Sequence, residues 1–123
     1  MSDPRPTAYL KRSCPFCLKL RIALTELGQA DAVGYVTFDD GDDTHQRLRR
    51  QMEDAGQQPS FPAVAFGTGK LETGTDDLIA RFAAKADRSA ADLPLLQYYD
   101  EGVFKGYGAM FRELRELKAA QSA

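Results

Sequence analysis

The stretch KRSCPFCLKL, residues 11–20, holds both cysteines of this 123-residue chain, with a proline and a phenylalanine between them. A proline suits the first position of a helix, because its missing N–H is not needed there and its φ angle is already helical. The stretch therefore predicts that Cys14 is the N-cap of a helix. Cys17 then lies one turn further along the same face, within disulfide reach of Cys14.

This position predicts a reactive thiol at Cys14. The free amides of Phe16 and Cys17 point toward its sulfur, and the helix dipole adds positive potential. Lys11 and Arg12 precede it and add positive charge. Such surroundings lower a cysteine pKa from about 8.5 into a range of about 3.5–7.5. We expect Cys14 to attack a disulfide and Cys17 to resolve the mixed disulfide that forms.

Two other uses of a cysteine pair compete with this one. A structural zinc site needs about four ligands, whereas the chain offers two cysteines and one histidine, so no metal is expected. That histidine, His45, falls in a charged helix start and is expected on the solvated surface. A pair of ordinary buried cysteines is the other alternative, and the proline and the helix start disfavour it.

Composition excludes several classes of protein. With 16 Lys and Arg against 18 Asp and Glu, the net charge is −2 and suggests no nucleic-acid partner. No apolar run approaches the roughly 18 residues of a membrane helix, and the first residues lack a signal-peptide pattern. We expect a cytoplasmic protein without a membrane anchor, where C-x-x-C usually serves redox chemistry or metal binding.

The patterns of apolar residues, glycines and prolines predict four strands and three helices before a helical tail. The expected strands are residues 7–10, 33–38, 62–66 and 71–72, and the expected helices are 15–27, 44–55 and 77–86. Because a helix joins the first two strands, they must run parallel, and the GTGK turn makes the last two a hairpin. The result is an α/β fold with a mixed four-stranded sheet flanked by helices. Thr75 or Asp76 is expected to cap the third helix.

A second motif is PSFPAVAF, residues 59–66, in which a proline opens an apolar strand. Proline is unusual there because it removes a hydrogen-bond donor from the sheet. A trans proline on an edge strand is the commoner explanation for such a motif alone. Beside a C-x-x-C helix, we expect a cis Phe61–Pro62 bond that turns the Phe61 backbone outward.

Three motifs, in order, resemble the glutaredoxins, which are thiol–disulfide oxidoreductases with a thioredoxin-like fold. KRSCPFC is similar to the family's K-x-x-C-P-Y-C, and SFPAVAF to its T-V-P strand with a cis proline. GKLETGTDDL is similar to G-K-x-I-G-G-x-D-D-L, where the family holds glutathione. The resemblance covers about residues 6–96. It implies a dithiol enzyme that uses glutathione as co-substrate and has no tightly bound cofactor.

The resemblance also implies roles for individual residues. Cys14 is the nucleophile and Cys17 the resolving thiol. The resemblance implies glutathione contacts along one groove. A glutathione carboxylate lies near Lys11, the cysteinyl part pairs with the Phe61 backbone, and the γ-glutamyl end lies at the start of the third helix. The contact residues are Lys11, Phe16 (in place of the family's tyrosine), Phe61, Pro62, Gly74, Thr75 and Asp76, the last accepting the ammonium group.

The implied substrates are disulfide-bearing or glutathionylated proteins, reduced by a monomer. One alternative is an iron–sulfur binding module, in which Cys14 and a glutathione cysteine ligate a cluster across a dimer. Another keeps the redox chemistry but takes electrons from a thioredoxin-reductase-like donor. Lys19 and Arg21 either extend the cationic surroundings of the thiols or solvate the exposed helix face, and DDGDD at 39–43 is expected as a solvated turn and helix cap.

The last 27 residues exceed the usual glutaredoxin length. GAMFRELRELKAA predicts a helix with one apolar stripe, formed by Met110, Phe111, Leu114 and Leu117. We expect a domain of residues 1–96 and a helical extension, 97–123, that packs on it through this stripe, away from the thiols. A dimer contact or a lid is the alternative. The extension is too short for the all-helical second domain of a glutathione transferase.

Overall fold

The computed structural model of the protein describes residues 5–122, and it contains one mixed sheet of four strands in the order β2-β1-β3-β4. Strand β1 (Thr7–Lys11) is central, parallel to β2 (Gly34–Phe38) and antiparallel to β3 (Ala63–Ala65). Strand β4 (Leu71–Thr73) pairs antiparallel with β3 at the other edge. The α/β thioredoxin-like fold predicted from the sequence is confirmed.

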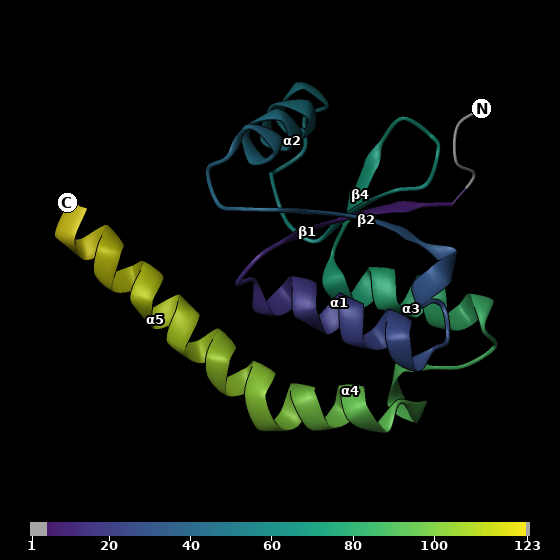
Figure 1. The fold of residues 1–123 in the computed structure, drawn as a ribbon. Coiled ribbons are helices and arrows are strands. Elements are labelled where there is room, and N and C mark those ends of the chain that lie inside the picture. Colours follow the sequence, from purple (N-terminus) through teal and green to yellow (C-terminus); the bar gives the residue numbers. More distant parts are fainter. Residues whose placement is uncertain (1–4, 123) are drawn as a thin grey trace.

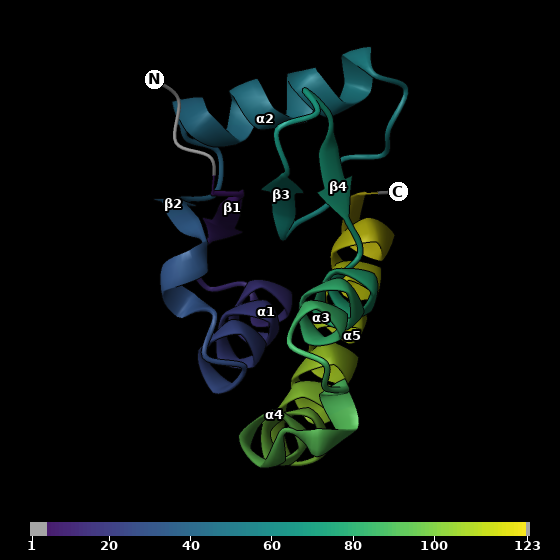
Figure 2. The same cartoon turned by 90° about the vertical axis from the view of Figure 1, so that its right-hand side faces the viewer.

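Helices cover both faces of this sheet (Figures 1 and 2). Helices α1 (Pro15–Glu26) and α3 (Thr75–Lys85) lie on one face, and α2 (Asp43–Asp54) lies on the other. Helix α4 (Pro94–Tyr99) lies beyond α1, on its side away from the sheet. The remaining helical segments are the 3₁₀ turns η1 (Ala30–Ala32) and η2 (Ala90–Asp92), the π-helix η3 (Asp100–Phe104) and α5 (Lys105–Ser122). None of the described helices is long and apolar enough to cross a membrane.

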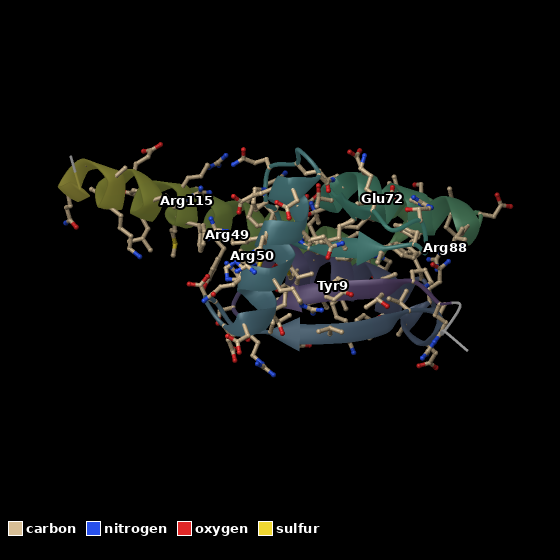
Figure 3. All side chains as sticks on the ribbon, turned by 90° about the horizontal axis from the view of Figure 1, so that it is seen from above. Tyr9, Arg49, Arg50, Glu72, Arg88 and Arg115 are labelled. Carbon is tan, nitrogen blue, oxygen red and sulfur yellow. The ribbon has the colours of Figure 1, made fainter. Side chains whose placement is uncertain are left out.

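The alternation of side chains along β1 divides the core between the two faces. Leu10 is buried in the cluster beneath α1 and α3, whereas Tyr9 packs against the cluster beneath α2, which contains Leu48. Figure 3 labels Tyr9 in the sheet and Arg49 and Arg50 on α2. Both arginines are exposed, so α2 turns its apolar stripe to the sheet and its charges to solvent.

The ends of the elements follow the predicted signals except at the start of α3. Gly28 and Gly56 follow α1 and α2 in the left-handed conformation, with φ of 72° and 75°. Helix α3 begins at Thr75 with Gly74 as its N-cap, so neither Thr75 nor Asp76 caps it as expected. Gly74 has a φ of 94°, which allows the chain to turn from β4 into α3 without a linker.

The prediction that the apolar stripe of the tail is buried was wrong. Met110, Leu114 and Leu117 are 63%, 48% and 55% exposed, and Phe111 is 37% exposed. The reason lies in the backbone, because α4, η3 and α5 follow one another without a turn and the residues at both junctions have right-handed helical angles. The described chain has no turn that folds α5 back, and the helix projects outward from the body formed by the sheet and the other helices (Figure 1).

Candidate active site

Cys14 is the N-cap of α1, as predicted. Its backbone is extended, with φ −102° and ψ 115°, and Pro15 follows as the first helical residue. The Cys17 N–H donates a hydrogen bond to the Cys14 sulfur at 3.4 Å. Cys17 is 3% exposed, Cys14 is half-buried, and both are free thiols. The pair therefore places one accessible sulfur in front of a second, enclosed one.

The surroundings separate the acidities of the two thiols. The pKa of Cys14 is lowered to about 6, first by the hydrogen bond from the Cys17 side chain, against the opposing effect of burial. Hydrogen bonds from the backbone N–H groups of Cys17 and Phe16 and the charge of Lys11 contribute to the same lowering. The pKa of Cys17 is raised, first by its hydrogen bond to Cys14 and then by burial. At neutral pH Cys14 is the thiolate and Cys17 the proton donor that stabilises it.

This separation predicts selective alkylation. Iodoacetamide reacts with the thiolate, so the rate of Cys14 labelling should rise as pH increases from about 5 to 7 and then level off, since its pKa is about 6. Cys17 should stay unlabelled in the folded protein over this range. Peptide mass spectrometry after timed alkylation measures both rates. Labelling of Cys17 before Cys14 at pH 6 would contradict the assignment.

The Phe61–Pro62 peptide bond is cis, which confirms the prediction from PSFPAVAF. The Phe61 ring packs against Phe38 and His45, with ring centroids 5.0 and 5.3 Å apart. The expectation of a solvated His45 was wrong, because this side chain is 8% exposed and its Nδ1 accepts the Gly41 N–H at 2.7 Å. The histidine thus supports the residue that precedes the cis proline.

Gly74, Thr75 and Asp76 lie at the N-terminus of α3, and Asp76 is connected to α1 through Lys19. The Lys19 ammonium lies 3.0 Å from an Asp76 oxygen and 2.9 Å from an Asp100 oxygen. Lys19 is buried, which excludes the solvated role considered for it. Burial alone would lower the pKa of Lys19, but hydrogen bonds to Asp100 and Asp76 raise it overall. The ammonium therefore stays charged.

The other cations near the thiols have partners. Lys11 Nζ lies 3.4 Å from Asp40 and Arg12 lies 2.9 Å from Asp39, so the acidic turn partly neutralises both. Arg21 stacks on the Tyr35 ring at 3.8 Å. The Lys11 backbone N–H donates to the Cys17 sulfur at 3.4 Å, which ties the end of β1 to the cysteine pair.

The beginning of the tail packs on the first turn of α1. The Tyr99 hydroxyl donates to the Pro15 carbonyl at 2.8 Å, and the Phe104 ring meets Phe16 edge-on at 5.1 Å. A cavity of about 420 Å³ lies beside Cys14 on this side of the helix. It is lined by the end of β1, one face of α1 and the tail, including Leu10, Cys14, Leu18, Arg21, Tyr99, Val103 and Tyr107.

Fold and site together explain what the sequence is similar to. The family model described as glutathione S-transferase, N-terminal domain, matches residues 9–119. The chain belongs to this family. No curated protein and no solved structure matches it significantly. Glutathione S-transferase N-terminal domains are thioredoxin-like and imply a role related to glutathione, and the cysteine pair of this one adds the groups for thiol chemistry. Residues 5–122 contain no group of three His, Cys, Asp or Glu side chains that could hold a metal.

Sequence reasoning missed three residues of this glutathione S-transferase N-terminal domain that bear on the site. Tyr99, Asp100 and Phe104 all come from the tail, in the segment QYYDEGVF. Their mixture of aromatic and acidic residues was a signal, but the partners Pro15, Lys19 and Phe16 lie about 80 residues earlier in the chain. These pairs could not be predicted from the sequence without knowing the path of the chain after α3.

Proposed function

We propose that this protein is a glutathione-dependent thiol–disulfide oxidoreductase of the glutaredoxin type. The observation that carries the proposal is the cysteine pair, in which Cys14 at the helix start has a pKa of about 6 and Cys17 donates a hydrogen bond to it. A half-buried thiolate can attack a disulfide, and an enclosed thiol one turn away can resolve the mixed disulfide that forms. The cis peptide bond before β3 and the family's relation to glutathione agree with it.

The reaction proceeds by two exchanges. The Cys14 thiolate attacks the glutathione sulfur of a mixed disulfide, forms a Cys14–glutathione disulfide and releases the substrate as a thiolate, which takes up a proton. A second glutathione thiolate then attacks this disulfide, which releases oxidised glutathione and the Cys14 thiolate. With a protein disulfide, Cys17 attacks the Cys14 mixed disulfide, and two glutathione molecules reduce the resulting Cys14–Cys17 bond.

The proposed glutathione groove runs from the thiols across the cis proline to α3. The backbone of Phe61 pairs with the cysteinyl part, and the N-terminus of α3 receives the γ-glutamyl carboxylate. The full proposed set is Lys11, Phe16, Phe61, Pro62, Gly74, Thr75 and Asp76. The proposal includes a cytoplasmic location, where the thiols stay reduced. It also includes a catalytic domain of residues 1–96 with an extension of residues 97–123.

Two parallel assays test this function. Reduction of a glutathionylated peptide is followed with glutathione and glutathione reductase, and separately with thioredoxin reductase in place of both. Turnover in the assay with glutathione and glutathione reductase, but not in the assay with thioredoxin reductase, supports the proposal. Turnover only with thioredoxin reductase would assign the donor to the other class, and no turnover in either assay would reject the oxidoreductase function. Visible absorption after anaerobic purification would indicate the iron–sulfur alternative.

A further inference from the structure

The Lys19 ammonium joins three parts of the molecule that are distant in sequence. It comes from α1 and contacts Asp76 on α3 and Asp100 at the start of η3. It also lies 4.5 Å from the centre of the Phe104 ring. The lysine side chain is 10% exposed, whereas the Asp76 carboxylate is 84% exposed and the Asp100 carboxylate 24%. One buried cation therefore has one open and one enclosed carboxylate partner.

The charges of this cluster do not cancel. One ammonium and two carboxylates sum to a charge of −1. The exposed carboxylate, Asp76, carries the negative charge that a ligand can reach. A cavity of about 220 Å³ lies at the cluster and is lined by Lys19, Asp76, Gln97 and Asp100 among others. Because the Asp76 side chain is 84% exposed, a cationic group of a ligand can reach its carboxylate. If Asp100 were neutral, Lys19 would balance Asp76 completely, and the attraction for such a group would fall.

We propose that Asp100 is a specificity-determining positioning residue, which holds Lys19 and thereby leaves Asp76 negative enough to accept the ammonium group of glutathione's γ-glutamyl end. This inference rests on the proposed function. It assigns to the tail a part in distinguishing a thiol with a free α-amino group from one without it. Asp100 acts through Lys19 and takes no part in the sulfur chemistry.

Glutathione and its analogue with a glutaryl group, which lacks only the ammonium, are the probes. Each reduces the same mixed disulfide, and chromatography of the released thiol gives kcat and KM for both in the same way. Asp100→Asn should raise the KM for glutathione about threefold to tenfold, leave kcat unchanged and leave the KM for the analogue unchanged. Asp100→Glu should restore the selectivity of the wild type.

Two further variants sharpen the test. Lys19→Gln keeps a hydrogen-bond donor but removes the cation, so it should shift selectivity in the opposite direction, toward glutathione. It keeps the test decisive if Asp100→Asn fails to fold. Glu101→Gln is the matched control, because Glu101 is the exposed neighbour of Asp100 and its loss removes the same charge. Its selectivity should equal that of the wild type.

The outcomes separate the two proposals. If Asp100→Asn raises the KM of both thiols equally, or changes neither, Asp100 does not determine specificity and the inference is overturned while the enzyme's function stands. The same holds if Glu101→Gln has the effect expected for Asp100→Asn. A wild-type protein that shows no turnover with glutathione would remove the proposed function and this inference together.

Discussion

Replacement of Cys14 by serine is expected to reduce turnover of a glutathionylated peptide by roughly three orders of magnitude or more, because a serine hydroxyl remains protonated at neutral pH. No second thiolate replaces it, since Cys17 is 3% exposed and its pKa is raised. The glutathione reductase assay measures the loss. Unchanged thermal unfolding of Cys14→Ser would show that the effect is chemical.

The matched substitutions at Cys17 separate its two roles. Cys17→Ser removes the resolving thiol but keeps a hydroxyl that can donate to the Cys14 sulfur, so turnover of glutathione mixed disulfides should persist while reduction of protein disulfides falls. Cys17→Ala also removes the donor, which is the first cause of the low pKa of Cys14. Its Cys14 alkylation should therefore require a higher pH. A Cys17→Ser variant that loses all mixed-disulfide turnover would contradict the claim that Cys14 alone, with a hydrogen-bond donor beside it, suffices for glutathione mixed disulfides.

The residues predicted from the sequence are those whose conformation depends on nearby residues. Pro15 and the following helix pattern placed Cys14 at the N-cap, and Gly28 marked the end of α1, because both act through their own backbone angles. The cis bond at Pro62 was also predicted, from a proline at the start of an apolar strand together with the cysteine motif.

The errors concern side chains whose environment is supplied by distant segments. For Lys19 the sequence left a solvated role and a role beside the thiols open, and neither includes its actual partners, Asp76 on α3 and Asp100 on η3. His45 reads as a solvated residue between charges, yet Phe38 and Phe61 pack against it from β2 and the segment before β3. Sequence periodicity identifies an apolar stripe on α5, but it does not determine whether another surface is present to cover it.

Two truncations distinguish the parts of the tail. Ending the chain after residue 96 removes Tyr99, Asp100 and Phe104, so α1 loses its contacts at Pro15 and Phe16, and Lys19 keeps only Asp76. Full burial of a large apolar side chain contributes about 1.5–3 kcal/mol, and Tyr99 is 8% exposed while Phe104 is partly buried. Their loss together should lower the melting temperature by roughly 10 °C. A cooperative unfolding transition that remains would support a domain of residues 1–96.

Ending the chain after residue 108 is the control, because it removes the exposed stripe and keeps all three contacts. Its melting temperature should stay within about 3 °C of the full chain, since exposed side chains contribute little to stability. Differential scanning calorimetry compares the three proteins, and sedimentation gives the mass of each. If the truncation after residue 108 destabilises the protein as much as that after residue 96, the stripe is covered in solution. If the full chain is a dimer and the truncated chain a monomer, a second copy of the chain covers the stripe. If the oligomeric state is the same for both, α5 folds back on its own domain.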